Sequence, residues 1–301
     1  MSLSRRSLAA AAGIVADLAL GEPPVQPHPV SAFGAAMHRV ERHIYGDHRA
    51  AGLLHAATGL LLGTTAGLLV RSTTLATYLS VAQRALVEAA LDLAAALEEG
   101  DLARARLLLP TLVGRDPDGL SAAEITRAVV ESVAENTVDA VVAPALWGAI
   151  GGAPGTLGYR AVNTMDATVG HRSARYLHYG WASARLDDLA NYLPARLTAA
   201  LVLVVRPRAA PAVWRAVRRD APAHPSPNAG VAEAAFAAAL GVKLGGLNTY
   251  GALVERRPAL GSGRAPETSD IAATVALCRD VTYALVVVLV VVGLFAKASP
   301  A

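Results

Sequence analysis

The sequence predicts an all-α, polytopic integral membrane protein, and three observations lead to this fold class. Hydrophobic residues make up 53% of the 301 residues, whereas charged residues make up 17% and aromatic residues only 5%. The apolar content is therefore small and aliphatic, which suits helices that pack closely in a bilayer. A nearly unbroken aliphatic run occupies 281–296 between Asp280 and Lys297. We expect four to five membrane-embedded helices, with amphipathic helices and polar loops, in one integral-membrane domain of residues 1–301.

The charge and the cysteine content exclude several classes of protein. The net charge is only +3, and no long block of Lys or Arg is interleaved with aromatic residues, so no nucleic-acid partner is expected. The single cysteine, Cys278, excludes an intrachain disulfide and any cysteine-rich metal site. The N-terminal apolar run resembles a signal peptide, but Asp17 and the Gly-Glu-Pro-Pro that follows interrupt it. We therefore expect a retained N-terminus and a multi-pass protein of the cell membrane.

The N-terminal third alternates apolar and amphipathic segments. The helix expected at 7–20 is shorter than the roughly 20 apolar residues that a bilayer crossing needs. A proline-rich loop follows it, because proline fixes φ and removes a backbone donor. We then expect a short amphipathic helix at 31–47 and a membrane crossing at 51–70. The charged, alanine-rich segment 73–109 predicts a helical pair outside the lipid, with a break at Gly100-Asp101.

The next helix carries an acidic stripe. Ser121 and Glu124 have the spacing of a capping box that begins a helix. Glu131, Glu135 and Asp139 follow at intervals of four residues, which places them on one face of that helix. Such acids repel one another at neutral pH, so the stripe indicates a site where arginines or Mg²⁺ offset the charge. An exposed acidic face on an ordinary helix is the alternative.

A run of glycines between Gly148 and Gly158 is predicted to form a loop or a close packing surface. Backbone N–H groups of a glycine-rich loop can bind phosphate. However, no strand precedes this run, and no Gly-Lys-Ser/Thr follows it, so it is weak as a nucleotide-binding motif. Close helix packing or a re-entrant turn explains the glycines equally well.

The densest polar region comes directly after the glycines. Its polar residues are Tyr159, Arg160, Asn163, Asp166, His171, Arg172, Arg175, His178, Tyr179, Arg185, Asp187 and Asp188. The arginines have the fork geometry that binds phosphate or carboxylate through two hydrogen bonds, although an arginine here is also an ordinary interfacial anchor. The aspartates offer the hard oxygen ligands that Mg²⁺ prefers, and His171 offers a group for proton transfer. Together these residues indicate a functional site.

The C-terminal third contains the remaining membrane segments. We expect a spanning or half-spanning element at 189–205, followed by a basic flank at 206–220 on the cytoplasmic side. A proline-rich loop then leads into an alanine-rich helix that ends at Gly245-Gly246. Lys243, near this end, is either an interfacial lysine or a phosphate contact. A polar loop at 251–268 precedes the last membrane helix.

Four blocks of the chain together resemble the CobD/CbiB family of cobalamin biosynthesis, adenosylcobinamide-phosphate synthase. The blocks are DLALGEPPVQPHPVSAFG, ESVAENTVDAVVAPALWGAIGG, GYRAVNTMDATVGHRSARYLHYGWASARLDDLANYLPARLTA and SPNAGVAEAAFAAALGVKLGGLNTYGA. The resemblance covers nearly the whole chain. It implies a membrane ligase that joins adenosylcobyric acid to (R)-1-amino-2-propanol or its phosphate, with ATP and Mg²⁺. Lipid, a second copy of the chain and other enzymes of the pathway are the further expected partners.

The roles of individual residues are expectations from the chemistry of this reaction. For catalysis we expect Glu131, Glu135, Asp166 and His171. For substrate or phosphate binding we expect Asn136, Arg160, Asn163, Arg172, Arg175 and Lys243. For Mg²⁺ we expect Glu135, Asp139 and Asp166. A membrane carrier of corrinoids and a non-catalytic scaffold of the pathway are alternatives, because intramembrane charges also mark transport pathways.

Overall fold

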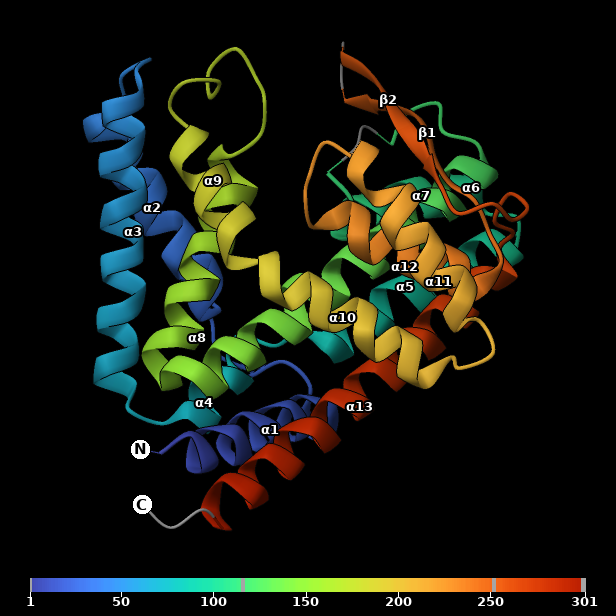
Figure 1. The fold of residues 1–301 in the computed structure, drawn as a ribbon. Coiled ribbons are helices and arrows are strands. Elements are labelled where there is room, and N and C mark those ends of the chain that lie inside the picture. The colour runs from blue at the N-terminus through green and yellow to red at the C-terminus, as the bar shows by residue number, and fades with distance from the viewer. Residues whose placement is uncertain (1, 115–116, 251–252, 299–301) are drawn as a thin grey trace. The chain divides into compact units, whose positions relative to one another are not determined.

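The computed structural model describes residues 2–114, 117–250 and 253–298, and it confirms the predicted all-α membrane fold class (Figure 1). Three helical runs in this part of the chain are long and apolar enough to cross a membrane: Arg49–Val70, Ala122–Val169 and Ser269–Ala296. The helices Trp181–Ala190 and Tyr192–Val205 form a fourth span if this pair, bent by 40°, counts as one. The structure therefore offers three or four crossings.

The chain divides into two compact units, each built from segments that are distant in sequence. The first unit comprises Met1–Ala82, Asp139–Pro194 and Leu285–Ala301, and the second comprises Gln83–Val138 and Ala195–Ala284. That both units belong to one integral-membrane domain stays a prediction.

The first unit is a bundle of helices. It contains α1 (Leu3–Leu20), α2 (Pro29–Ile44), α3 (Arg49–Val70), α4 (Thr73–Tyr78), the π-helical segment η2 (Val138–Val142), α8 (Ala143–Val169) and α9 (Trp181–Ala190). Helix α3 presents Gly59, Gly63 and Gly67 to α8 at intervals of four residues. A methyl group at Gly63 would collide with Leu157 and Ala161 of α8. Small residues on one helix face thus let these two backbones approach closely.

The glycine run is not a loop between elements, so that part of the prediction is wrong. Residues 148–158 lie within α8, which is sharply kinked at Gly152, where φ is +66°. Beyond the kink the chain turns back on itself, because Thr156 Oγ1 donates a 3.3 Å hydrogen bond to the carbonyl of Pro144. Gly155 lies against the backbone of Trp147. Of the interpretations that the sequence left open, close packing is confirmed, and a re-entrant turn in the membrane stays a prediction.

The second unit surrounds α7 (Ala122–Thr137) with shorter helices. These are α5 (Gln83–Glu98), α6 (Leu102–Leu108), η1 (Leu109–Thr111), most of α10 (Tyr192–Val205), α11 (Ala210–Arg219), η3 (Ala221–Ala223), α12 (Ala229–Leu240) and the first half of α13 (Ser269–Ala298). The predicted break at Gly100 separates α5 from α6. The capping box of Ser121 and Glu124 is present at the start of α7, with both reciprocal hydrogen bonds formed.

A β-hairpin replaces two predicted features of the second unit. Helix α12 ends at Gly241, which has a left-handed conformation, and Gly245-Gly246 instead belong to β1 (Leu244–Tyr250). Strand β2 (Leu253–Leu260) pairs antiparallel with β1 and occupies part of the predicted loop 251–268, of which residues 251–252 lie outside the described residues. The prediction missed this hairpin because its residues lack the apolar alternation that marks a half-buried strand.

Candidate functional site

The predicted site residues lie in both units, and each unit is described by itself. Glu131, Glu135, Asn136 and Lys243 belong to the second unit. Asp139, Arg160, Asn163, Asp166, His171, Arg172 and Arg175 belong to the first.

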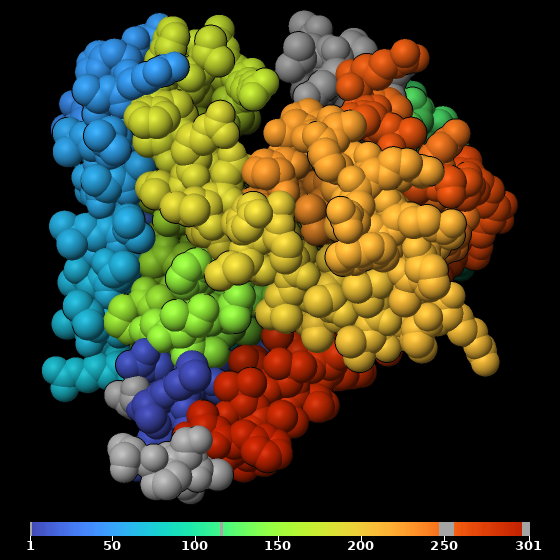
Figure 2. Space-filling view, in the orientation of Figure 1, coloured from blue at the N-terminus to red at the C-terminus, as the bar shows by residue number. Residues whose placement is uncertain are grey.

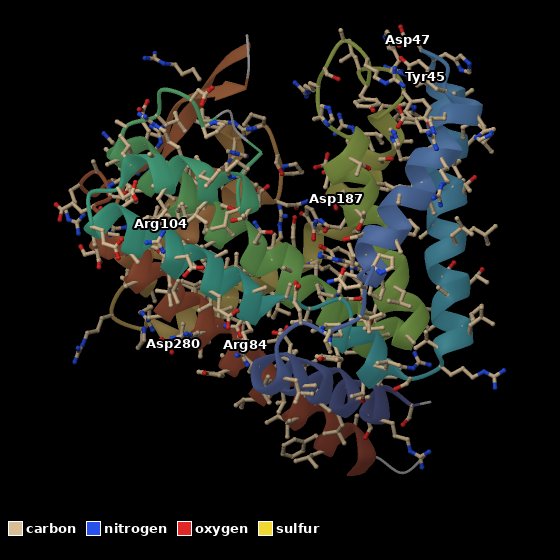
Figure 3. The ribbon with its side chains drawn as sticks, turned by 180° about the vertical axis from the view of Figure 1, so that it is seen from behind. Tyr45, Asp47, Arg84, Arg104, Asp187 and Asp280 are labelled. Carbon is tan, nitrogen blue, oxygen red and sulfur yellow. The ribbon has the colours of Figure 1, made fainter. Side chains whose placement is uncertain are left out.

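In the first unit, two aspartates and two asparagines form a hydrogen-bonded group, which we call the Asp–Asn cluster: Asp139, Asn163, Asp187 and Asn191. The amide of Asn163 donates to Asp139 Oδ2 at 3.2 Å and to Asp187 Oδ1 at 3.4 Å. The amide of Asn191 donates to Asp187 Oδ2 at 2.9 Å. Asp187, labelled in Figure 3, lies on α9, whereas Asn163 lies on α8. The cluster therefore ties α8 and α9 to the π-helical segment that carries Asp139.

A tyrosine and an arginine of α8 complete the cluster. The hydroxyl of Tyr159 donates to Asn191 Oδ1 at 2.9 Å, and Arg160 Nη1 donates to Asn163 Oδ1 at 3.2 Å. The Nε of Arg160 is buried and makes no hydrogen bond within the described residues. Buried polar groups are rarely left unsatisfied, so this nitrogen is a donor that lacks an acceptor in the described part of the chain. The cluster can thus offer carboxylate oxygens and a guanidinium together.

Asp139, Arg160 and Asn163 were given roles at a site from the sequence. Tyr159 and Asp187 were in the polar region that indicated a site but received no final assignment, and Asn191 was missed. The pairs Tyr159 with Asn163 and Asp187 with Asn191 are each four residues apart, a spacing that places both members on one helix face. The π-helical segment at Asp139 had no signal in the sequence, although such segments often occur at functional sites.

Arg175 is engaged in an ion pair within the protein. Its Nη2 lies 2.9 Å from Oε1 of Glu41 on α2, and its guanidinium lies 4.1 Å above the ring of Tyr45. Tyr176 also donates its hydroxyl to Glu41 at 3.0 Å, and His38 Nδ1 lies 3.0 Å from the other carboxylate oxygen. Burial by itself would raise the pKa of Glu41, but the hydrogen bonds from Arg175 and Tyr176 hold this pKa below its usual value.

This contact anchors the segment 170–180, which carries two more of the expected residues. His171 is exposed, and its ring meets that of Tyr176 edge-on at 4.9 Å. Arg172 is exposed beside it, and Asp166 is half-buried near the end of α8. The structure thus holds His171 against Tyr176, whose hydroxyl is hydrogen-bonded to Glu41.

In the second unit, a cavity of about 270 Å³ opens beside α7, and we call it the acidic pocket. Its polar lining residues are Glu131, Ser132, Glu135, Asn136, His224, Ser226, Glu233 and Arg257. Leu112, Val113, Gly114, Ala128 and Ala229 complete the wall. Three of the expected residues are therefore together in one pocket, whereas Lys243 is exposed and is not part of its lining.

One wall of the acidic pocket is α7, fixed to the start of the hairpin. The buried carboxylate of Glu131 accepts a 2.9 Å hydrogen bond from the backbone N–H of Gly245. Arg127, one turn before, donates to the carbonyl of Gly245 at 2.9 Å. Further along the helix, Asn136 donates to Ser132, and Glu135 is exposed. The glycines at the start of β1 are needed because Gly246 has φ +117° and a side chain there would collide with Arg127.

The opposite wall holds residues that the sequence assignments missed. Arg257 Nη1 lies 2.8 Å from His224 Nε2, and His224 Nδ1 lies 3.1 Å from both the backbone nitrogen and the carbonyl oxygen of Ser226. The buried carboxylate of Glu233 lies 3.7 Å from the same Nε2. Glu233 lies in the block SPNAGVAEAA and His224 lies two residues before it. Their signal was the presence of ionisable side chains in an alanine-rich helix and in the loop that leads to it.

The described residues contain no group of three or more His, Cys, Asp or Glu side chains arranged to hold a metal ion. The expected Mg²⁺ ligands Glu135, Asp139 and Asp166 therefore stay a prediction. Mg²⁺ usually takes one or two protein carboxylates and completes its coordination with water and substrate phosphates. The paired carboxylates of Asp139 and Asp187 fit that donor set.

Apolar helices with polar clusters among them define the chain as a polytopic membrane protein that carries ionisable sites. A model of the CobD/Cbib protein family matches residues 10–278, and the chain belongs to this family.

Relatives along nearly the full length support the same family. "Cobalamin biosynthesis protein CobD" of Mycobacterium tuberculosis (strain H37Rv) is 45% identical over 295 residues, which cover 92% of each chain. The protein of the same name from Geobacter metallireducens is 44% identical over 273 residues, covering 84% of this chain and 86% of its own. That of Halalkalibacterium halodurans is 37% identical over 310 residues, covering 96% and 97%. No solved structure matches the chain.

Proposed function

We propose that this protein is the ligase that forms an amide between adenosylcobyric acid and (R)-1-amino-2-propanol or its phosphate, giving adenosylcobinamide or its phosphate. Family membership supports the pathway, since the relatives are named for cobalamin biosynthesis. The observation that carries the reaction is the acidic pocket, in which Glu131 and Glu135 line one wall and Glu233 lies beside the paired Arg257 and His224 on the other. Such a pocket is complementary to a small molecule with an ammonium group at one end and an anionic or hydroxyl group at the other.

The reaction requires an activated carboxylate. Hydroxide is a poor leaving group, so a carboxylate and an amine do not condense at neutral pH. Transfer of the γ-phosphoryl group of ATP to the carboxylate gives an acyl phosphate and ADP. The free amine then attacks the carbonyl carbon, phosphate leaves with the C–O bonding pair, and the nitrogen loses one proton. The protein must orient both reactants, stabilise the phosphoryl charge and accept that proton.

The acidic pocket suits the amine. At about 270 Å³ it fits a small amino alcohol, and a corrinoid is far too large to enter it. In this proposal the corrinoid presents its propionate side chain at the mouth of the pocket. Glu135, exposed there, and Glu233, beside His224, bind the ammonium group and accept its proton. Arg257 contacts the hydroxyl or phosphate end of the substrate.

The Asp–Asn cluster suits the phosphates of ATP. Asp139 and Asp187 would hold Mg²⁺, and Arg160, whose Nε is unsatisfied, would contact a phosphate oxygen. A bound Mg²⁺ neutralises phosphate charge during the transfer. Asn163 keeps both aspartates oriented, because its amide bridges them. The exposed His171 and Arg172 are further proposed contacts, for proton transfer and for phosphate.

The proposal is tested with protein purified in detergent and supplied with adenosylcobyric acid, ATP and Mg²⁺. Either (R)-1-amino-2-propanol or its phosphate is the amine, and the product is followed by mass spectrometry. We expect the mass of the new amide, together with stoichiometric ADP, and neither product without ATP. Corrinoid binding without any amide product from either amine would contradict the ligase and favour the carrier or scaffold.

A further inference from the structure

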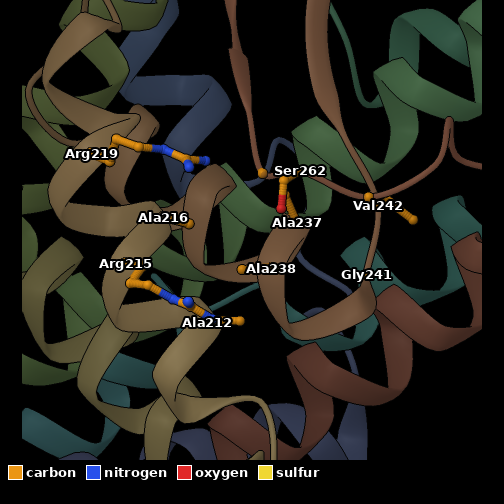
Figure 4. Close-up of a pocket in the computed structure, with 11 residues that line it drawn as sticks. Ala212, Arg215, Ala216, Arg219, Ala237, Ala238, Gly241, Val242 and Ser262 are labelled. Carbon is orange, nitrogen blue, oxygen red and sulfur yellow. The ribbon is translucent and has the colours of Figure 1, made fainter.

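A second cavity of the second unit has a basic character that the proposed reaction does not use. It has a volume of about 300 Å³, and we call it the arginine pocket (Figure 4). Arg215 and Arg219 of α11 line one side, and the turn Gly261, Ser262 and Gly263 lines another. Alanines of α11 and α12 and the residues at the end of α12 close it. Among the described residues, none of those that line this cavity carries a carboxylate.

The walls of the arginine pocket are held in place by one aspartate. Asp220 forms a two-point ion pair with Arg219, at 2.6 Å to Nε and 3.2 Å to Nη2. The same carboxylate accepts a 3.0 Å hydrogen bond from the backbone N–H of Gly261, where the turn begins. Hydrogen bonding to Arg219 keeps the pKa of Asp220 low, so this brace is charged at neutral pH. Helix α11 and the turn are therefore fixed relative to each other.

Both arginines retain donors for a ligand. The pair with Asp220 uses Nε and Nη2 of Arg219 and leaves its Nη1 group. Within the described residues, Arg215 donates through Nε, at 3.2 Å to the carbonyl of Pro211, and its two terminal nitrogens make no hydrogen bond. Ser262 adds a hydroxyl directed into the cavity (Figure 4). Two guanidinium groups and a hydroxyl are donors suited to the tetrahedral oxygens of a phosphate group.

Helix α11 directly follows the apolar helix α10 in the chain. Arg206, one residue after the apolar α10, pairs at 2.7 Å with Asp280, one residue before the aliphatic run of α13. This ion pair therefore marks where both apolar segments meet water. Helix α11 begins four residues after Arg206. Four residues of fully extended chain reach at most about 14 Å, so the start of α11 lies within that distance of Arg206. Trp214 of this helix is exposed, and α11 lies on the face seen in Figure 2.

We propose that the arginine pocket binds the phosphate group of a phosphate ester at the membrane surface. Two sources have this chemistry: the headgroup of an anionic phospholipid and a soluble phosphate compound. The short segment of chain between the Arg206–Asp280 pair and α11 favours the lipid. The exposed tryptophan and the basic face of α11 are those of a helix that lies in the interface between lipid and water. The site is distinct from the acidic pocket, since the two cavities share no lining residue.

The test uses the full chain in an uncharged detergent and isothermal titration calorimetry. The ligands are phosphatidylglycerol and phosphatidylcholine with identical acyl chains, each supplied in the same detergent, and inorganic phosphate. We expect saturable binding of one phosphatidylglycerol per chain, at least tenfold tighter than phosphatidylcholine. Arg215→Gln should weaken this binding about tenfold, the loss expected for one charge-assisted hydrogen bond. Ser262→Ala should weaken it by a smaller factor, and neither change touches the Asp220 brace.

The matched control is Arg218→Gln, which removes the same charge from the same helix. Arg218 lies 5.3 Å over the ring of Trp214 and does not line the cavity. Phosphatidylglycerol affinity within twofold of the parent protein is expected for this variant. If inorganic phosphate binds as tightly as phosphatidylglycerol and Arg215→Gln weakens both, the phosphate site stands and its source is soluble. The proposal is overturned if neither ligand binds, or if Arg218→Gln weakens binding as much as Arg215→Gln does.

Discussion

The backbone N–H of Gly245 donates a 2.9 Å hydrogen bond to the buried carboxylate of Glu131, and this contact joins the acidic helix α7 to the hairpin. Glu131 is therefore both a wall of the acidic pocket and the acceptor for a backbone group distant in sequence. Its structural and catalytic roles can be separated by two substitutions.

Glu131→Gln keeps an oxygen that can accept from Gly245, whereas Glu131→Ala removes it. We expect Glu131→Ala to lower the free energy of unfolding by about 1–3 kcal/mol, the cost of an unsatisfied buried donor. Glu131→Gln should change stability little but reduce turnover at least tenfold. Thermal unfolding and amide formation are measured on the same samples, with Glu88→Gln on the exposed face of α5 as the control. Full turnover in Glu131→Gln would leave Glu131 a purely structural role.

The role of Arg257 is tested by comparing the two amine substrates, aminopropanol phosphate and free aminopropanol. Arg257→Gln removes the guanidinium next to His224. If Arg257 contacts the phosphate end of the substrate, KM for aminopropanol phosphate should rise about tenfold or more. The KM for free aminopropanol should change much less. An equal rise for the two amines would assign Arg257 to the positioning of His224 instead.

If the Asp–Asn cluster binds the phosphates of ATP, a substitution that disrupts the cluster should reduce ATP consumption. Asn163→Ala removes the amide that bridges Asp139 and Asp187, which leaves the two carboxylates to repel each other. We expect ADP release to fall about 10- to 100-fold, the range typical of losing a group that orients metal ligands. The control is Asp188→Asn, whose side chain pairs with Arg185 outside the cluster. Equal losses in both variants would argue against a specific role of the cluster.

The contact between Glu41 and Arg175 predicts a pH dependence of stability. The pKa of Glu41 is lower in the folded protein than its usual value, so its contribution to stability is complete above the unfolded pKa. This contribution is lost as the pH falls through the folded pKa. The parent protein should therefore lose stability below about pH 4.5 more steeply than Glu41→Gln does. Chemical unfolding from pH 3 to 7 measures both slopes, and identical slopes would contradict the prediction.

The glycines of α3 predict a packing effect with an internal control. Gly63→Val would place its side chain against Leu157 and Ala161 of α8, and overpacking costs about 1–3 kcal/mol or more. Gly151→Ala is the control, because a methyl group there meets no atom within 4 Å among the described residues. Thermal unfolding in detergent should show a lower midpoint for Gly63→Val only. A comparable loss in both variants would mean that close approach is not what α3 requires.

Local signals predicted most helices well. The capping box at Ser121 began α7 as expected, and the apolar run after Arg49 became α3, because both depend on interactions within a few residues. The glycine run was misjudged because a φ of +66° at Gly152 breaks a helix whose two arms then pack on each other. The hairpin was missed for a similar reason: Gly245 and Gly246 are stabilised by Arg127 and Glu131, more than a hundred residues away.

The sequence by itself determined the membrane character, the helical class, the family and the acidic stripe, because each follows from composition, periodicity or a contiguous block of residues. Only the tertiary structure decided which polar residues meet. The regular spacing of Glu131, Glu135 and Asp139 suggests one site, yet the first two line the acidic pocket and Asp139 joins Asn163 and Asp187 in the Asp–Asn cluster. The physical reason is the π-helical segment that begins at Val138, which changes the helical phase at Asp139, so that Asp139 belongs to the first unit with α8 and α9, whereas Glu131 and Glu135 belong to the second. Contacts of that kind depend on residues distant in the chain, and a pattern along one helix does not contain them.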